Sequence, residues 1–122
     1  MKRILIVDDA ATVRMYHRDI LEAAGYTVEE AVNGVEALEK SLQQPFELYV
    51  VDINMPKLDG YGFLRELRAQ DIVQAPAIMI STEAESGDRT QAYAAGANAY
   101  LVKPVKPENL LMHVRILMGK SV

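Results

Sequence analysis

The chain contains no cysteine, which excludes a disulfide framework and any metal site built from thiolates. It also has no apolar run long enough to span a membrane, and residues 1–3 lead directly into a short strand-like run rather than into a targeting segment. The formal net charge is -4 at pH 7 and no basic patch is visible, which argues against nucleic-acid binding. We therefore expect a cytoplasmic domain that binds neither nucleic acid nor a membrane.

What the chain does contain fits a single globular domain. Of its 122 residues, 50% are hydrophobic and 25% are charged, which supplies enough apolar material for a complete core. No linker, internal repeat or low-complexity segment divides the sequence. We therefore expect residues 1–122 to form one domain.

Short apolar runs alternate along the chain with segments of helical period. This alternation predicts an α/β fold, in which βαβ units build a buried parallel sheet with helices on both faces. Asn33 is expected to cap the second helix, Asp59 stands where the third opens, and Pro107 fits the first position of the last. The strands are expected over residues 3–7, 26–31, 47–51, 77–81 and 99–102.

Charged residues follow three of the expected strands. Asp8 and Asp9 come after the first strand, Asp52 after the third, and Lys103 after the fifth. The carboxyl ends of parallel strands meet at one edge of an open α/β sheet, which is where such sheets bind ligands. We therefore expect three carboxylates and one ammonium group to share a small pocket.

Such a pocket has a definite chemistry. Clustered carboxylates repel one another and stay ionised only if a cation neutralises them, and a hard divalent ion such as Mg²⁺ does so through oxygen ligands. The Lys103 ammonium could pair with Asp52 at rest and with a phosphoryl oxygen afterwards, and the Ser81 hydroxyl could donate to the same group. Each residue alone has an ordinary explanation as a cap, a turn residue or a solvated charge. Their combination indicates a phosphoryl-acceptor site.

Four segments resemble the receiver domain of two-component response regulators, in order and at that family's usual separations. They are Val7-Asp8-Asp9, residues 51–60, Ile80-Ser81-Thr82 and Val102-Lys103-Pro104. The resemblance covers essentially the whole chain, and its motifs are jointly specific. It implies the flavodoxin-like, doubly wound fold of chemotaxis receivers, with five parallel strands in the order 2-1-3-4-5 and helices on both faces.

The resemblance also implies a role for each residue of the metal and acceptor site. Asp52 matches the phosphoacceptor, which takes its phosphoryl group from the phosphohistidine of a sensor histidine kinase or a histidine phosphotransfer protein, or from a small phosphodonor. Asp9 matches the direct ligand of Mg²⁺, and Asp8 matches the carboxylate that holds a water on the metal. Asn54 matches the position whose backbone carbonyl completes the metal shell.

Three further residues match the switch that reads the phosphoryl group. Ser81 matches the switch hydroxyl, Lys103 the lysine that pairs with the phosphoryl group, and Tyr100 the switch aromatic. By the same resemblance, the peptide bond between Lys103 and Pro104 is expected to be cis. When the Ser81 hydroxyl moves toward the phosphoryl group, it is expected to open a space that the Tyr100 ring fills from outside.

The lifetime of the phosphorylated state depends on three neighbours of the acceptor. Thr82 stands where the family usually has a smaller Ala or Gly, which is expected to slow transfer or hydrolysis. Asn54 and Glu83 resemble the pair found in fast-hydrolysing chemotaxis-type receivers, so their effect opposes that of Thr82. The chain is expected to be no classical enzyme, although it should phosphorylate itself from small phosphodonors with Mg²⁺ and dephosphorylate itself.

The leading hypothesis is a stand-alone, phosphorylation-dependent signalling switch without an output domain of its own. It should be a monomer, with dimerisation on phosphorylation, and should control a downstream target protein. The surface that changes should combine the fourth helix, the fifth strand and the fifth helix. Its candidate contact residues are Ala84, Arg89, Tyr100, Val102, Lys106 and His113.

Other functions are compatible with parts of the sequence. A phosphotransfer intermediate or a phosphate sink would use the same chemistry. A small α/β phosphatase of the haloacid-dehalogenase type is disfavoured because Asn54 stands where a second aspartate is needed. Flavodoxins carry a Ser, Thr and Gly-rich loop where this chain has paired aspartates, and a nucleotide-binding loop ending in Lys-Ser/Thr is absent.

The two histidines have no carboxylate partner at a suggestive spacing. His17 and His113 both fall in helical segments, so we expect them to be surface residues with no role in catalysis or phosphoryl donation.

Overall fold

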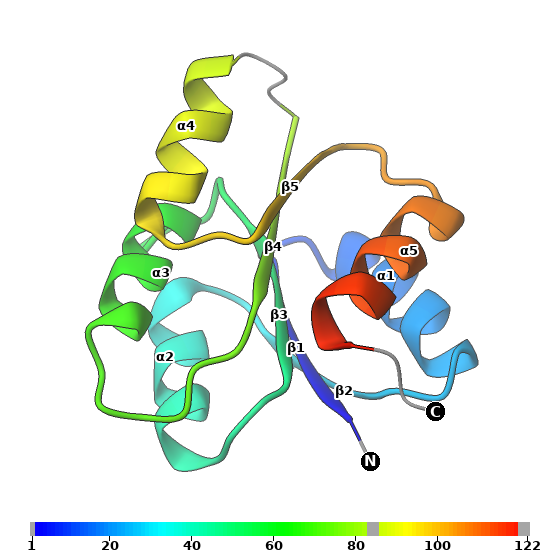
Figure 1. Cartoon of the computed structure of the whole chain (residues 1–122), viewed down its shortest axis with the longest axis horizontal. Helices are drawn as coiled ribbons and strands as arrows, with labels where there is room; N and C mark the ends of the chain where they lie inside the picture. The colour runs from blue at the N-terminus through cyan, green and yellow to red at the C-terminus, as the bar shows by residue number, and fades with distance from the viewer. Residues whose placement is uncertain (1, 83–85, 120–122) are drawn as a thin grey trace.

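The computed structural model describes residues 2–82 and 86–119, in which five strands alternate with five helices (Figure 1). The strands are β1 (Arg3–Val7), β2 (Thr27–Ala31), β3 (Leu48–Asp52), β4 (Ala77–Ser81) and β5 (Ala99–Val102). The helices are α1 (Ala11–Ala23), α2 (Gly34–Gln43), α3 (Gly60–Arg68), α4 (Ser86–Ala95) and α5 (Pro107–Met118). The predicted alternation of strands and helices is therefore confirmed.

All strand pairs are parallel, and the sheet order is β2-β1-β3-β4-β5, as the resemblance implied. Two strands were predicted to start one residue too early, because Tyr26 and Glu47 precede β2 and β3. β3 also extends through Asp52, whose backbone stands in register with Ile80 of β4. The acceptor candidate is thus part of the sheet rather than of the loop that follows it.

Alternation along the strands divides the core into two layers. Helices α2, α3 and α4 cover one face of the sheet, and α1 and α5 cover the other (Figure 1). In β1, for example, Leu5 and Val7 belong to the first core cluster, whereas Ile4 and Ile6 belong to the second. Every residue of β3 and β4 is buried, which is typical of central strands in a sheet covered on both faces.

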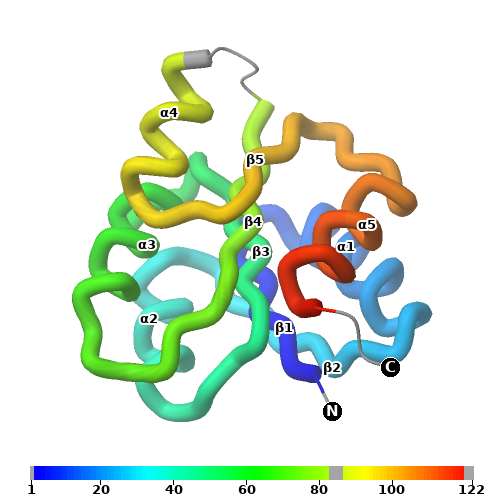
Figure 2. Tube along the Cα trace, viewed as in Figure 1, coloured from blue at the N-terminus to red at the C-terminus, as the bar shows by residue number. Residues whose placement is uncertain are grey.

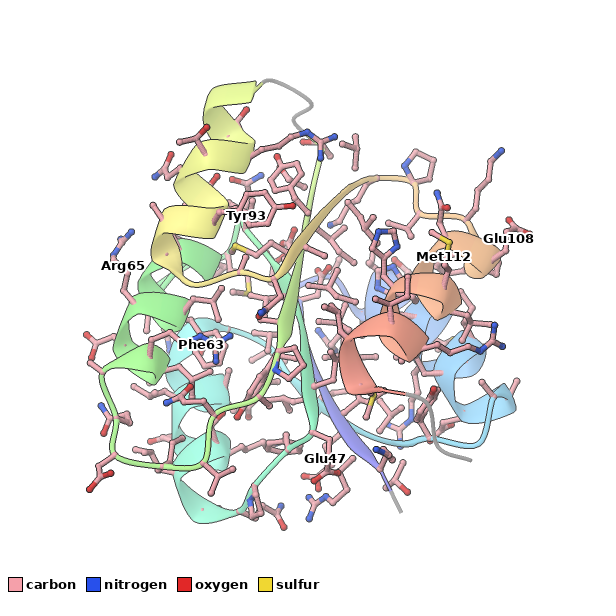
Figure 3. The ribbon with its side chains drawn as sticks, in the orientation of Figure 1. Glu47, Phe63, Arg65, Tyr93, Glu108 and Met112 are labelled. Carbon is pink, nitrogen blue, oxygen red and sulfur yellow. The ribbon has the colours of Figure 1, made fainter. Side chains whose placement is uncertain are left out.

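Helix ends form where the sequence predicts them. The Asn33 side chain accepts a hydrogen bond from the Glu36 N–H at 2.8 Å, and Asp59 caps α3 in the same way. Pro107 occupies the first turn of α5. Along α3, Phe63 points to the sheet and is fully buried, whereas Arg65 points outward (Figure 3). The caps and Pro107 fix where α2, α3 and α5 begin.

The five strands run from the edge that holds the N-terminus toward the opposite edge (Figure 2). The segments that follow β1, β3, β4 and β5 therefore emerge on the same side. Among the helices in the described part of the chain, none combines the length and apolar character needed to cross a membrane.

Candidate functional site

The first two carboxylates lie in the turn between β1 and α1. Asp8 is buried, with 3% of its surface exposed, and its N–H donates to the carbonyl of Ala31 at 3.1 Å. Its side-chain Oδ1 accepts from the N–H of Ala10 at 2.9 Å. Asp9 is exposed. The turn therefore fixes Asp8 inside the pocket and presents Asp9 at its rim.

The Lys103 ammonium joins the two buried carboxylates of the pocket. Asp52, at the end of β3, is only 5% exposed. Lys103 Nζ lies 3.0 Å from Asp52 Oδ1 and 3.3 Å from Asp8 Oδ2. The pair with Asp8 joins residues 95 apart in the sequence. The ammonium therefore partly neutralises two mutually repelling acids.

The protonation of this cluster reflects burial and charge together. Burial raises the pKa of Asp52, and the negative charge of Asp8 raises it further, while Lys103 acts in the opposite direction without cancelling these effects. Burial opposes the charge of Lys103, but its hydrogen bond to Asp52 and the nearby carboxylates outweigh burial, so the pKa of Lys103 is raised. The lysine therefore stays charged, and the pocket still favours additional positive charge.

The carboxylates also fit a divalent cation. One oxygen from each of Asp8, Asp9 and Asp52 lies within 4.8 Å of the others, close enough to share one ion. Carboxylate oxygens are hard ligands of the kind that Mg²⁺ prefers. Asn54, two residues beyond β3, has an exposed side chain. The donor set is therefore suited to Mg²⁺.

Ser81 ends the neighbouring strand, β4, and is buried with 1% exposure. Its carbonyl accepts a hydrogen bond from the Lys103 N–H at 2.7 Å, so the two residues lie side by side across β4 and β5. Thr82 follows and is exposed, whereas Glu83 lies outside the described residues. The Lys103-Pro104 bond is cis, which confirms that prediction.

His17 is not the surface residue that the sequence suggested. It is buried, with 3% exposure, and its ring lies 5.5 Å from the Tyr16 ring. It lines a pocket of about 420 Å³ beside Lys103 and Thr82. The spacing of Val13, His17 and Leu21 would have indicated this burial, because residues four apart share a helix face.

Burial of His17 should make folding stability sensitive to mild acid. Burial lowers the pKa of His17, with Asp8 raising it and Lys103 lowering it to a smaller extent. The unfolded chain therefore takes up a proton below about pH 6.5 that the folded chain resists, and stability falls as the pH drops toward the lowered pKa. When the pH is lowered from 7.5 to 5.5, we expect the thermal midpoint of His17→Leu to fall by less than that of the parent. An equal loss in both proteins would contradict this prediction.

The expected output surface is only partly exposed. The Tyr100 ring is already buried, with 3% exposure, so the expectation that it waits outside the fold is wrong. The Arg89 guanidinium holds the Tyr100 ring in this position. The guanidinium lies 4.9 Å from the ring centroid and donates a hydrogen bond to the Tyr100 carbonyl at 3.3 Å. Lys106 is exposed, Val102 and His113 are half-buried, and Ala84 lies outside the described residues.

Two residues support the site although neither was assigned a role there from the sequence. A Cβ at Gly60 would stand 2.6 Å from the Asp52 carbonyl oxygen, so only glycine lets α3 begin this close to Asp52. Gly60 directly follows the cap residue Asp59 and lies eight residues after Asp52, and this position could have indicated its proximity to the site. Arg14 donates to the Asp8 carbonyl at 2.6 Å, a contact that no sequence pattern indicates.

Comparisons with known proteins place these features in a family. A sequence model of the response regulator receiver domain matches residues 4–115. Transcriptional regulatory protein ResD of Bacillus subtilis (strain 168) is 35% identical over 119 residues, which cover 98% of this chain and 49% of that protein. The chain spans about half the length of the curated relatives it matches.

Solved structures of similar size share the fold. Chemotaxis protein CheY4 of Vibrio cholerae is 36% identical with a TM-score of 0.90, covering 96% of this chain and 98% of that one. The receiver domain of sensor histidine kinase PA1611 from Pseudomonas aeruginosa PAO1 is 32% identical with a TM-score of 0.90, covering 98% of both chains. That structure has a magnesium ion coordinated in its active site cleft.

Proposed function

Because the chain belongs to the response regulator receiver domain family, we propose that its phosphorylation-dependent switch works through acceptance of a phosphoryl group on Asp52. The donor would be the phosphohistidine of a sensor histidine kinase or of a histidine phosphotransfer protein. One observation carries this assignment, namely the Lys103 ammonium 3.0 Å from Asp52 Oδ1, with Asp8 and Asp9 around the same pocket. A carboxylate in this position can attack phosphorus while the Lys103 ammonium neutralises the negative charge of the phosphoryl oxygens.

The transfer requires little covalent chemistry from the protein. An Asp52 oxygen forms the new bond to phosphorus as the bond from phosphorus to the donor imidazole breaks. Phosphoryl transfer depends mainly on positioning and on charge neutralisation. A Mg²⁺ ion held by Asp9 and Asp52, with Asp8 and the Asn54 carbonyl completing its shell, would neutralise phosphoryl oxygens. Lys103 neutralises them from the other side.

The switch follows from the new acceptor oxygens. The phosphorylated Asp52 side chain gains charge, so Lys103 exchanges its carboxylate partner for a phosphoryl oxygen, and the Ser81 hydroxyl donates to another. Charge-assisted hydrogen bonds contribute roughly 1.5 to 3 kcal/mol each, which is enough to move a two-state equilibrium from minority to majority. The supporting observation is that Ser81 ends β4 and Lys103 directly follows the neighbouring β5, with the Lys103 ammonium already paired to Asp52.

Labelling with a small phosphodonor tests the proposal. The chain incubated with acetyl phosphate and Mg²⁺ should gain the mass of one phosphoryl group, and hydroxylamine should remove it, as expected for an acyl phosphate. The label should also decay without added protein. We propose that Asn54, Thr82 and Glu83 set this decay rate. Absence of labelling under these conditions would contradict the acceptor assignment.

The output should pass through α4, β5 and α5. Tyr100 lies under α4 with Arg89 against its ring, so a shift of Ser81 at the neighbouring strand end reaches α4 through one side chain. The exposed part of this face continues with Lys106, which precedes α5, and with Met112 on α5, labelled in Figure 3. We propose that a downstream target protein contacts this surface after phosphorylation, and that Ala84, Val102 and His113 contribute to it.

Beryllofluoride, which mimics the phosphoryl group, allows this output to be measured in the chain itself. We expect beryllofluoride to shift the amide signals of Arg89, Tyr100 and Lys106. In Tyr100→Ala, the shifts of the α4 signals should fall to half or less. In the separate labelling experiment with acetyl phosphate, Asp52 of this variant should still be phosphorylated. Tyr93→Ala, an exposed change on α4, is the matched control and should keep the shifts. Equal loss in both variants, or signals confined to α1, would contradict the proposed surface.

Receiver domains act with histidine kinases and downstream targets, and we propose that this one does so in the cytoplasm, as a monomer that can dimerise on phosphorylation. Use as a phosphotransfer intermediate or phosphate sink would require the same Asp52 chemistry but no change at Tyr100. The beryllofluoride experiment therefore separates these roles.

A further inference from the structure

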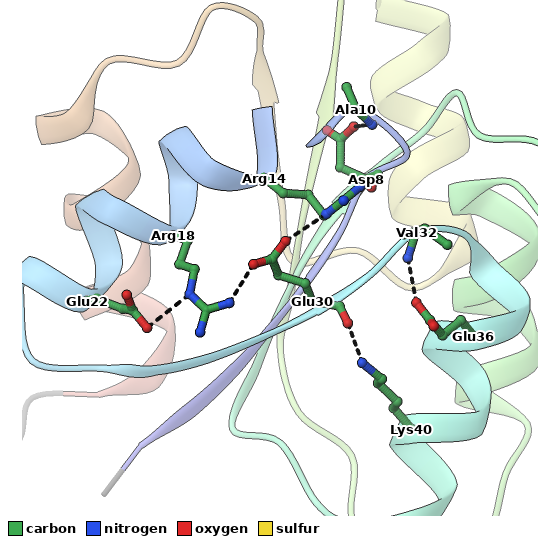
Figure 4. Close-up of polar contacts among 9 residues, drawn as sticks. All are labelled: Asp8, Ala10, Arg14, Arg18, Glu22, Glu30, Val32, Glu36 and Lys40. Atoms are coloured by element: carbon green, nitrogen blue, oxygen red, sulfur yellow. Dashed lines mark hydrogen bonds and ion pairs between the residues drawn. The ribbon is translucent and has the colours of Figure 1, made fainter. Parts of the chain in front are cut away.

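A charged network links β2 and α1 to the acidic pocket (Figure 4). The Glu30 carboxylate on β2 accepts hydrogen bonds from two arginines of α1, with Arg14 Nε 2.7 Å from Oε1 and Arg18 Nη1 2.5 Å from Oε2. Arg18 also pairs with Glu22 at 3.1 Å. Only Arg14 continues to the pocket, because its Nη1 donates to the carbonyl of Asp8 at 2.6 Å. The two arginines therefore share a partner but differ in what else they hold.

Arg14, the arginine that contacts Asp8, is also less exposed than Arg18. The Arg14 side chain is 14% exposed, against 38% for Arg18 and 45% for Glu22. Alternation along β2 puts Glu30 on the same face as Val28, which packs in the core beneath α1 and α5. The hydrogen bond from Arg18, together with that from Arg14, holds the pKa of Glu30 below its usual range, so Glu30 is an anion near neutral pH.

Asp8 is consequently held at all of its polar groups. Its N–H donates to Ala31 of β2, its carbonyl accepts from Arg14, and its carboxylate accepts from the Ala10 N–H. The carbonyl belongs to the peptide group that joins Asp8 to Asp9. Its orientation therefore sets the direction in which the Asp9 side chain leaves the backbone.

Asp9 depends on this backbone for its position. Within residues 2–82 and 86–119, its carboxylate contributes to the acidic cluster but makes no hydrogen bond or ion pair. Groups that orient a metal ligand typically change metal affinity by 10 to 100-fold when they are removed. A contact that fixes the Asp8-Asp9 peptide is therefore able to tune the site without touching the ion.

We infer that Arg14 and Glu30 are positioning residues, which fix the Asp8-Asp9 peptide and thereby set the affinity of the pocket for Mg²⁺. This inference rests on the proposed function, in which Asp9 ligates the ion. Glu30 acts by holding the Arg14 guanidinium, and Arg14 acts by holding the Asp8 carbonyl. The β2 strand thus contributes to the site indirectly, because Glu30 lies outside the pocket and acts through Arg14.

Titration with Mg²⁺, followed by amide signals of the isotope-labelled chain, tests the inference. We expect Arg14→Gln and Glu30→Gln to weaken Mg²⁺ binding by about tenfold. The matched control is Arg18→Gln, which also removes an ion pair with Glu30 but has no contact with Asp8, and it should stay within about twofold of the parent. The variant with both changes, at Arg14 and at Glu30, should bind Mg²⁺ no more weakly than the single variant with the lower affinity, because the two residues act as one unit.

A second readout needs no metal. In Mg²⁺-free protein, Arg14→Gln should shift the Asp8 carbonyl carbon and the Asp9 amide nitrogen, whereas Arg18→Gln should leave both in place. If Arg14→Gln does not fold, Arg14→Lys serves instead, since one ammonium is less able than a guanidinium to hold both Glu30 and the Asp8 carbonyl. A shift and weakened binding in this variant support the inference.

Two results would overturn the positioning role. One is unchanged Mg²⁺ affinity and unchanged signals in the Arg14 variants, and the other is an equal effect of Arg18→Gln, which would indicate general loosening of α1. Failure of the metal assignment is distinguishable, because Asp9→Ala would then retain Mg²⁺ binding. In that case the metal-free signals of Asp8 and Asp9 still decide whether Arg14 fixes the peptide.

Discussion

The Asp52→Asn variant should gain no phosphoryl group from acetyl phosphate and Mg²⁺, whereas the parent chain gains one. An amide oxygen has nearly the size of a carboxylate oxygen but lacks the charge and nucleophilicity needed to attack phosphorus. Mass spectrometry before and after hydroxylamine treatment measures the difference. Asp71→Asn, an exposed change in the loop before β4, should be labelled like the parent. Labelling of Asp52→Asn at the parent rate would refute the acceptor assignment.

The same substitution should stabilise the metal-free fold near neutral pH. Because the pKa of Asp52 is raised in the folded state, its protonated form contributes stability that is lost as the pH rises through the raised pKa. Removing the carboxylate removes this loss. The thermal midpoint of Asp52→Asn should therefore exceed that of the parent at pH 7, and the gain should shrink toward pH 4, near the ordinary pKa of an aspartate. A lower midpoint at pH 7 would show that the pair with Lys103 outweighs burial.

Asp9→Ala should lose the response of the chain to Mg²⁺. Asp9 supplies one of three carboxylates that lie close enough to share an ion, and it is the exposed one, so its removal takes one carboxylate from the cluster without opening the core. We expect the affinity to fall by more than about a hundredfold, beyond the range typical of residues that act only through a ligand. Amide signals around Asp8, Asp52 and Asn54 report the titration.

The control for this experiment is Asp19→Ala, an equally exposed acid on α1 outside the pocket. It should keep the parent affinity and the parent thermal midpoint. Unchanged Mg²⁺ affinity in Asp9→Ala would place the metal elsewhere. A lower metal-free midpoint in Asp9→Ala alone would instead indicate that Asp9 supports the turn after β1.

Much of the site could be predicted because its residues follow local patterns. Asp8, Asp52 and Lys103 each come directly after an apolar run, and parallel strands bring such positions to one edge whatever the details of packing. The caps at Asn33 and Asp59 are equally local, since each involves a side chain and an N–H three residues on. The strand order came from the resemblance alone, because the same alternation of strands and helices is compatible with several orders.

The sequence by itself therefore determined the fold class, the edge of the sheet that carries the site, and the acidic and basic residues gathered there. Helical spacing on α1 already pointed to the burial of His17, whereas only the tertiary structure decided that the Tyr100 ring is buried with Arg89 against it. It alone joined Arg14 to Glu30 and to the Asp8 carbonyl. The physical reason is that strand and helix periods act between neighbours in the chain, whereas these contacts depend on how α1 packs against β2 and how α4 packs against β5.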